Sequence, residues 1–293
     1  MEYSSIRKIR HNINLYLKII RKRRSSLAGF IIILIYIFMA TIGPILVPFD
    51  RTPNVSQRFR PPSWEHPLGT DYAGRDIFAQ IIHGSRDVLL VAFLTGIFTV
   101  IFGLTVGIIS GYAGGKIDTA LNTATNMLLI IPHFPLLLII AASIPRVMSP
   151  VEVAFIIGII GWAGLARAIR SQVLSIKEAN FIEAARCLGL GRLHIVFKEV
   201  MPNLMPYIAM NLVLSIISGI YSQVGLFFLG VMPYTSVNWG MMINIAMRQQ
   251  AVITPKLWLY LFSPIVAIIT LETGFILFLH ALEEIFNPRL REE

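Results

Sequence analysis

Charged residues are scarce in this chain. Asp, Glu, Lys and Arg make up 14% of its 293 residues, whereas hydrophobic residues make up 55%. A soluble domain carries about 25% charged residues, so the polar surface here is too small to cover a water-soluble globule. A mean hydropathy of +0.70 agrees with this. We therefore expect most of the chain to lie in lipid.

The chain has only one cysteine and lacks a nucleotide-binding motif. The single Cys187 excludes an internal disulfide and offers no metal-ligand pattern. No GxxxxGK[ST] sequence occurs, which excludes a phosphate-cradling loop of that kind. The net charge of +9 does not indicate nucleic-acid binding, because the basic residues cluster at the ends of apolar segments. We expect no catalytic residues and no metal site.

Long apolar segments are what the chain has in abundance. A membrane-spanning helix needs about 20 apolar residues. Six segments approach or exceed this length: 27–47, 88–109, 119–144, 151–169, 204–232 and 257–282. They are too long for barrel strands and lack strand-like alternation. The sequence predicts an all-α polytopic membrane protein with six transmembrane helices.

Two of the other features concern helix shape. Pro132 and Pro135 interrupt the third segment and are expected to bend it, because proline removes backbone donors. Residues 237–247 are uncharged but too short to span, which predicts an external or re-entrant helix.

Basic residues set the expected orientation. Eight Lys and Arg residues precede the first span, which predicts a protein of the cell membrane with its N-terminus in the cytoplasm. Because the number of spans is even, the C-terminus is expected in the cytoplasm too. The expected parts are a cytoplasmic basic arm (1–26), the first span (27–47), an extracytoplasmic segment (48–87), a five-helix core (88–282) with a cytoplasmic loop (170–202), and a cytoplasmic tail (283–293). The arm reads either as an interfacial helix on anionic lipid or as an ordinary basic anchor.

The loop 170–202 is too polar to span the membrane. Its apolar residues recur at helical spacing, and Gly189 and Gly191 predict a helix–turn–helix. Small Ala184 and Ala185, followed by Gly189, would let another surface approach the backbone closely. A solvated loop of good helix formers has the same composition, so both interpretations stand.

Motifs then point to a family. EAARCLG at 183–189, with Pro202 thirteen residues after Gly189, resembles the EAA motif of ABC importer permeases. Further similarity lies in HPLGTDYAGRDIF at 66–78, GYAGG at 111–115 with Asp118, Trp162 with Arg167 and Arg170, FLGV at 228–231, Trp239-Gly240 and NPRLR at 287–291. Together these motifs resemble the C-type permease of dipeptide and oligopeptide importers.

The resemblance implies a type I ABC importer permease fold with cytoplasmic coupling helices. The ATPase-coupling residues that it implies are Glu183, Ala184, Ala185, Gly189 and Pro202. It also implies a second, B-type permease subunit, two ATP-binding subunits and an extracytoplasmic substrate-binding protein. ATP and magnesium would be held by those partners, so this chain would be neither an enzyme nor a cofactor carrier. Di- and oligopeptides are the expected cargo, with oligosaccharides, nickel or glutathione as alternatives.

Polar residues inside the apolar segments are candidates for the translocation path, although they could instead bond to neighbouring helices. They are Asn122, Asn126, His133, Asn211, Ser215, Ser218, Ser222, Gln223 and Glu272. Glu272 stands where the family usually has an apolar residue. It reads either as a transport carboxylate or as a protonated or partnered glutamate at a subunit interface.

The extracytoplasmic segment has a compact motif with two interpretations. Gly69, Thr70, Asp71, Gly74, Arg75 and Asp76 are candidates for an outer gate or a contact with the binding protein. The alternative is a rigid turn held by an Asp–Arg pair.

Two other classes of protein fit less well. A secondary transporter would need carboxylates in several spans, and only Glu272 qualifies. An intramembrane hydrolase would need partnered groups at helical spacing, whereas His133 and His280 stand alone.

Overall fold

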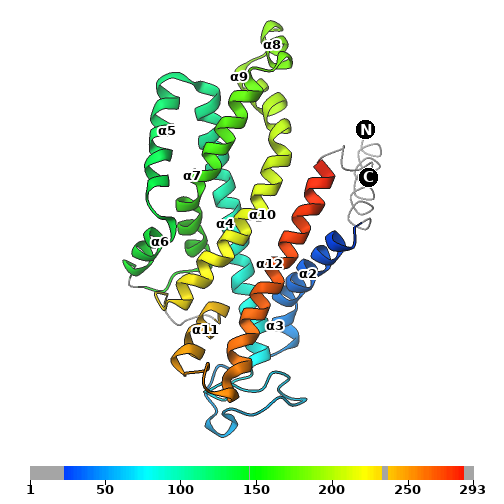
Figure 1. Ribbon diagram of the computed structural model, residues 1–293, viewed down its shortest axis with the longest axis vertical. Coiled ribbons are helices and arrows are strands. Elements are labelled where there is room, and N and C mark those ends of the chain that lie inside the picture. Colours follow the sequence, from blue (N-terminus) through cyan, green and yellow to red (C-terminus); the bar gives the residue numbers. More distant parts are fainter. Residues whose placement is uncertain (1–22, 145, 233–236, 287–293) are drawn as a thin grey trace. The chain divides into compact units, whose positions relative to one another are not determined.

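The computed structural model describes residues 23–144, 146–232 and 237–286 (Figure 1). The α-helices are α2 (Arg24–Thr41), α3 (Gly43–Leu46), α4 (Ile77–Ala113), α5 (Gly115–Ile130), α6 (His133–Ala142), α7 (Pro150–Lys177), α8 (Asn180–Cys187), α9 (Arg192–His194), α10 (Met201–Phe228), α11 (Trp239–Arg248) and α12 (Trp258–Phe286). Short 3-10 turns η1 (Val55–Gln57) and η3 (Pro255–Leu257) and a π-helical stretch η2 (Ile195–Val200) complete the elements. No strand occurs in the described ranges, which confirms the all-α class.

The expected spans are confirmed in number. Five of the described helices are long and apolar enough to cross a membrane, and the bent pair α5 and α6 makes a sixth span if counted as one. The break between these two helices turns the chain by 82°. Pro132 lies at the break and precedes the first residue of α6. The predicted bend of the third span is therefore confirmed.

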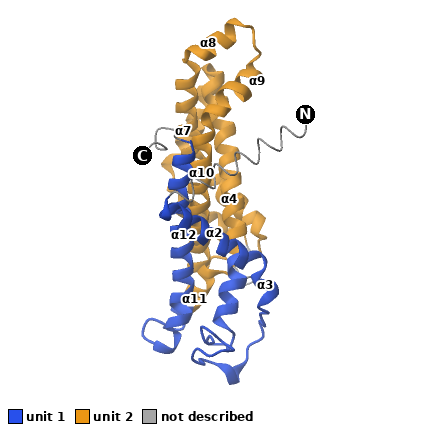
Figure 2. Cartoon of the chain, turned by 90° about the vertical axis from the view of Figure 1, so that its right-hand side faces the viewer, with its two compact units in different colours: residues 1–86, 246–293 blue, residues 87–245 orange. Residues whose placement is uncertain are grey.

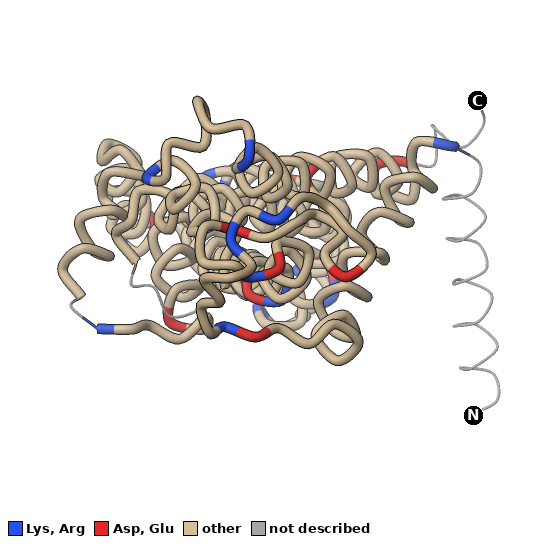
Figure 3. The backbone as a smooth tube through the Cα atoms, turned by 90° about the horizontal axis from the view of Figure 1, so that it is seen from below, with Lys and Arg blue, Asp and Glu red and all other residues tan. Residues whose placement is uncertain are grey.

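Charged residues are sparse along the described part of the backbone (Figure 3). Two predicted features, the basic arm up to residue 22 and the NPRLR sequence at 287–291, fall outside the described residues.

The chain divides into two compact units (Figure 2), which we describe separately. Unit 1 comprises the described parts of 1–86 and 246–293, and unit 2 comprises 87–245. This division differs from the expected one at its C-terminal side, because residues 246–282 cluster with α2 instead of with the other spans. No signal in the sequence pairs these distant segments.

Unit 1 is built on the packing of α2 against α12. Glycines let the two helices approach closely: a Cβ on Gly29 would lie 2.7 Å from the carbonyl oxygen of Gly274. Small residues serve this purpose at helix contacts in membranes, where lipid gives no hydrophobic drive to association. An ion pair from Arg23 Nε to Glu284 Oε2 (3.3 Å) joins the same two helices.

Unit 2 gathers α4 from Asp87 onward, α5, α6, α7 and α10, with α8 and α9 at one end (Figure 1). Near α8, the core contains Ile169 and Val173 of α7, Ile182 of α8, and Val200 and Leu204. The helix α7 has 28 residues and continues to Lys177. The first part of the expected loop 170–202 is therefore helix, because Ile169 and Val173 keep the i, i+4 spacing that buries one face.

Candidate functional site

Two residues separate the end of α7 from the start of α8. Glu178 is the C-cap of α7, and the Ala179 N–H donates to the Ile176 carbonyl at 3.0 Å. The eight-residue α8 is strongly amphipathic. It buries Ile182 (0% exposed) and Ala185 (5%) against the core of unit 2. Its opposite face is left open.

Glycine ends α8 for a conformational reason. Gly189 has φ +74°, the left-handed region that side chains disfavour. Its N–H donates to the Arg186 carbonyl (2.9 Å), and the Leu190 N–H donates to the Ala185 carbonyl (3.2 Å). These two bonds form a Schellman motif, which satisfies the last carbonyls of a helix. The predicted helix–turn–helix is therefore confirmed, with its turn at Gly189.

The FLGV sequence forms the same motif at the end of α10. The Gly230 N–H donates to Phe227 (3.0 Å) and the Val231 N–H to Leu226 (3.2 Å), and Gly230 has φ +71°. Two of the motif segments singled out in the sequence thus share one local structure.

The five residues predicted to couple to the ATPase do not all face the same way. Glu183, Ala184 and Gly189 are exposed, and a Cβ on Gly189 would meet no atom within 4 Å. Ala185 instead faces the core, so only one of the two alanines is open to another surface. Pro202 is exposed near the start of α10. It lacks an N–H for the carbonyl four residues earlier, to which we attribute the widened π-helical stretch just before it.

Sequence reasoning missed the apolar residues beside this turn. Leu188 is 78% exposed and Leu193 is 74% exposed. Their exposure next to an open glycine marks this end of unit 2 as an apolar surface. The only sequence signal was that two leucines flank the glycines of a loop.

The α7 helix that supports α8 is fixed by an ion pair. Arg170 donates from Nε to Asp118 Oδ1 (2.6 Å) and from Nη2 to Asp118 Oδ2 (2.7 Å), and Ser110 Oγ also donates to Asp118. Lys177 Nζ donates to the Tyr112 carbonyl at 2.9 Å. Bidentate pairs of this kind fix orientation as well as distance. The GYAGG motif and Asp118 thereby connect α4 and α5 to α7.

Four of the path candidates meet at one cavity inside unit 2. His133, Asn211, Ser215 and Ser218 line a cavity of about 160 Å³, together with Thr95 and Thr99. His133 Nε2 is buried and has no hydrogen-bond partner among the described residues. A space of this size with polar groups in its wall is large enough to hold several water molecules. The cavity wall is thus part polar and part apolar, because Ile157, Leu165 and Leu214 also line it.

Gly161 and Gly164 of α7 border the cavities in this region, whereas Gly158 packs closely against α4. A Cβ on Gly158 would lie 2.6 Å from Phe98 Cβ, and one on Gly161 would lie 3.5 Å from His133 Nε2. A Cβ on Gly164 would meet nothing within 4 Å. His133 and Gly161 also line a neighbouring cavity of about 360 Å³, which includes Gly164 and Ser218.

The remaining path candidates are placed elsewhere. Asn126 accepts a hydrogen bond from Arg167 Nη2 at 2.8 Å. Gln223 is fully buried and donates to Asp87 Oδ2 at 3.0 Å. The same oxygen accepts from Asn238 Nδ2 at 2.8 Å. Asn122 is half-buried on α5 and Ser222 is buried on α10, whereas Glu272 is buried on α12 in unit 1.

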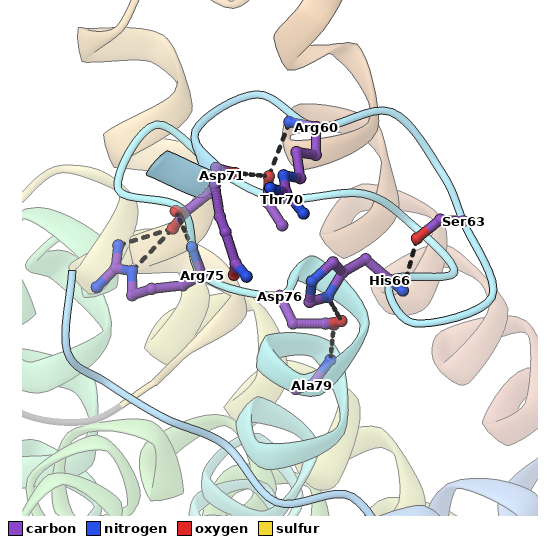
Figure 4. A network of polar contacts seen from close by, with 9 residues as sticks. Arg60, Ser63, His66, Thr70, Asp71, Arg75, Asp76 and Ala79 are labelled. Atoms are coloured by element: carbon purple, nitrogen blue, oxygen red, sulfur yellow. Dashed lines mark hydrogen bonds and ion pairs between the residues drawn. The ribbon is translucent and has the colours of Figure 1, made fainter. Parts of the chain in front are cut away.

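The motif at 66–78 forms a network in unit 1 (Figure 4). Asp71 is fully buried, and its carboxylate accepts from the Arg75 backbone N–H (2.9 Å), Arg75 Nε (2.9 Å) and Gln80 Nε2 (3.0 Å). Burial disfavours the Arg75 cation, but the Asp71 carboxylate outweighs this and raises the pKa of Arg75 above its ordinary value. The turn held by an Asp–Arg pair, one of the two sequence interpretations, is present.

The other members of the motif also serve the turn. Thr70 Oγ1 accepts from the Arg60 N–H (2.8 Å), and Asp76 caps α4 by accepting from the Ala79 N–H (2.7 Å). Gly69 and Gly74 both have positive φ, and a Cβ on Gly74 would lie 1.9 Å from the Asn54 carbonyl oxygen. Their contact with a partner stays a prediction.

Trp64 is the residue of this loop that the sequence analysis did not select. It is fully exposed to solvent, which is unusual for the largest apolar side chain. Its prolines on either side, Pro62 and Pro67, gave no sign of a special role.

Comparison with known proteins identifies related chains. Residues 103–292 match the family model described as "Binding-protein-dependent transport system inner membrane component". Residues 15–62 match the model described as "N-terminal TM domain of oligopeptide transport permease C".

Similar proteins align over nearly the whole chain. The dipeptide transport system permease protein DppC of Bacillus subtilis is 29% identical over 276 residues, 93% of this chain and 84% of that protein. The oligopeptide transport system permease protein OppC of the same organism is 28% identical and covers 93% of this chain and 88% of its own length. The metal-staphylopine import system permease protein CntC of Staphylococcus aureus is 33% identical, with 88% of each chain covered.

Proposed function

Because the chain belongs to the family of binding-protein-dependent transport system inner-membrane components, we propose that it is a permease subunit of an ATP-driven importer of di- and oligopeptides. It forms half of the translocation path with a second, B-type permease. Two ATP-binding subunits drive it, and an extracytoplasmic binding protein delivers its substrate. ATP and magnesium are bound by those subunits.

The single observation that carries this proposal is the open face of α8. A short helix with Ile182 buried beneath it presents Glu183, Ala184 and the bare turn at Gly189. Such a helix fits into a groove of an ATPase, because small residues let the two backbones approach. The bidentate Arg170–Asp118 pair joins α7, which leads into α8, to α5. A displacement of α8 would therefore move both α7 and α5.

The proposed coupling sets the orientation. The ATP-binding subunits are cytoplasmic, so the α8 end of unit 2 faces the cytoplasm. This agrees with the basic residues that precede the first span. The N- and C-termini then lie in the cytoplasm too.

The cavity beside His133 is our candidate for this subunit's part of the path. It brings hydroxyl, amide and imidazole groups from α4, α6 and α10 around one space. These groups can exchange hydrogen bonds with the amides of a passing peptide, as water does. Asn122, Asn126, Ser222 and Gln223 are assigned to the helix contacts that surround this space.

The cargo is proposed from the names of the relatives. Two of the three relatives carry dipeptide or oligopeptide in their names, and the third carries metal-staphylopine. Peptides are therefore favoured over oligosaccharides, nickel or glutathione.

The exposed loop with Trp64 is the proposed contact for the binding protein. The Asp71–Arg75 network holds this loop rigid. The binding protein would therefore meet a surface that is already ordered, which lowers the entropic cost of binding. Gly69, Thr70, Gly74 and Asp76 support the contact by shaping the loop.

The decisive experiment is transport by the reconstituted complex. The full chain, its B-type partner and its ATPases are placed in proteoliposomes with the binding protein outside, and uptake of labelled di-, tri- and pentapeptides is measured with and without ATP. We expect uptake that requires both ATP and the binding protein. ATP-dependent uptake of an oligosaccharide or metal complex, with no peptide uptake, would replace the cargo but keep the machinery. Uptake without ATP would refute the proposed function.

A further inference from the structure

An apolar groove runs along unit 2 beside the α8 turn. It has a volume of about 970 Å³ and is lined on one side by α4, where Ile101, Leu104 and Ile108 form a stripe that ends at Tyr112. Its other side is formed by the chain from Gly189 to Met201. These α4 residues belong neither to the path cavity nor to the coupling face, whereas the opposite wall begins at Gly189 of the α8 turn, which the coupling face shares.

The length of the stripe fits one membrane leaflet. From residue 101 to residue 112 an α-helix rises about 16 Å, and half of the hydrocarbon core is about 15 Å thick. Ile101 is 52% exposed, and Phe197 on the opposite wall is 59% exposed. A single acyl chain laid along α4 would cover these side chains over the depth of one leaflet.

The end of the groove is strongly basic. Lys177, Arg186 and Arg192 line it, and no acidic residue does. Lys177 Nζ donates one hydrogen bond, to the Tyr112 carbonyl (2.9 Å), and so has protons left for a ligand. Within the described part of the chain, neither Arg186 nor Arg192 forms an ion pair with a carboxylate. Two arginines without an ion-pair partner among the described residues thus stand at the mouth of an apolar groove, beside Lys177, whose charge also acts on the Asp118 carboxylate.

We propose that this groove is a binding site for one anionic phospholipid, whose phosphate meets Lys177, Arg186 and Arg192 and one of whose two acyl chains lies along α4. Two features identify the occupant: the charge complementarity at the mouth and the match between the stripe and one leaflet. Basic pockets at membrane depth select anionic head groups in this way. A bound lipid would brace the turn that holds Gly189, because it would touch both α4 and the segment after α8.

The test measures lipid binding to the assembled full-length complex by native mass spectrometry. Dioleoylphosphatidylglycerol and dioleoylphosphatidylcholine are titrated separately against the purified complex. We expect the anionic lipid to be retained in preference to the zwitterionic one. The double variant Arg186→Gln, Arg192→Gln should weaken its binding by about tenfold or more, because each basic residue near an anionic head group contributes roughly a fivefold factor.

A matched control separates a site from general surface charge. Lys198 is exposed on η2 next to the groove but does not line it. Lys198→Gln should change binding by less than about twofold. Equal losses in the double variant and in this control would overturn the proposal, because they would show attraction to a basic surface only.

Two further arms test the apolar part and the rival occupants. Thr105→Trp fills the groove from the exposed side of α4 without changing charge, and it should also weaken binding of the anionic lipid; unchanged binding would refute the groove as the site. Displacement of the lipid by millimolar glycerol phosphate would show a phosphate site instead. If the isolated full chain retained the lipid but the complex did not, a partner subunit would cover the groove in the complex, and the proposal would be overturned.

Discussion

Arg170 and Asp118 form a bidentate ion pair that joins α7 to the first turn of α5. Their side chains are 27% and 18% exposed, so water screens the pair only in part. We expect Asp118→Asn, which keeps the size of the side chain, to lower peptide uptake and the midpoint of thermal unfolding in detergent. A double-mutant cycle with Arg170→Gln should give a coupling of about 1 kcal/mol.

The control for this pair is Arg146, which pairs with Glu152 at 2.5 Å but is 61% exposed. Arg146→Gln should shift the unfolding midpoint little, because exposed ion pairs contribute a few tenths of a kcal/mol. If both variants behaved alike, the Arg170–Asp118 pair would have no special part in positioning α8.

Gly189→Arg tests the coupling face. The chain has space there, but a long side chain on this turn would keep the ATPase away. We expect the complex to insert and assemble while ATP hydrolysis loses its dependence on the binding protein and peptide uptake falls at least about tenfold. Hydrolysis and uptake are measured on the same proteoliposomes.

Gly115→Arg is the matched control for the turn. Gly115 also has positive φ (+56°) and open space around its Cβ position, but it lies at the start of α5. Both substitutions carry the same backbone strain of about 1 kcal/mol. Normal peptide uptake with Gly189→Arg would refute the coupling assignment, independently of the result for Gly115→Arg.

His133→Leu tests the His133 cavity. The change keeps much of the volume but removes the imidazole whose Nε2 faces the cavity. We expect peptide uptake to fall several-fold while ATP hydrolysis in the absence of peptide is retained. His280→Leu, an exposed histidine in unit 1, should change neither quantity. Equal uptake by the two variants would remove His133 from the path.

Trp64→Ala tests the outer contact. Because the indole is fully exposed, its loss should leave the unfolding midpoint within about 1 °C, in line with surface substitutions. We expect the concentration of binding protein needed for half-maximal uptake to rise about tenfold, since exposed tryptophans are frequent anchors of interfaces. Trp64→Tyr should bring this concentration most of the way back to the wild-type value. An unchanged concentration would place the contact elsewhere on the loop.

Glu272→Leu distinguishes the two interpretations of the buried carboxylate on α12. If the glutamate stabilises contacts between helices or subunits, the variant should assemble less well, and the complex that does form should keep the wild-type pH profile of uptake. Glu272→Gln should then assemble normally, because it keeps the shape and hydrogen-bonding capacity. A shifted pH profile in either variant would instead support a transport role.

Much of the fold could be predicted from the sequence, because membrane spans depend on local composition. The six apolar segments, the bend at Pro132 and the turn at Gly189 were all visible as local patterns. The pairing of α2 with α12 was not, since it depends on Gly29 and Gly274, which lie far apart in the chain and carry no pattern of their own.

The candidate site was predictable only in part. In a helix such as α4, which is apolar on nearly all sides, periodicity does not show which residues face a cavity. His133 and Ser215 could be recognised as polar residues in apolar segments, but not as neighbours. Likewise, the inward position of Ala185 follows from the packing of Ile182, which two adjacent alanines cannot reveal.

The glycines at 158, 161 and 164 give α7 uneven bending stiffness. Glycine in a helix interior weakens it by roughly 0.5–1 kcal/mol relative to alanine, and here three occur within two turns, at the level of the His133 cavity. Above and below that level the helix is held by the capping box of Ser149 and Glu152 and by the Arg170 pair. If α8 couples to an ATPase as proposed, a displacement of α8 should therefore bend α7 first at Gly161 and Gly164, beside the His133 cavity.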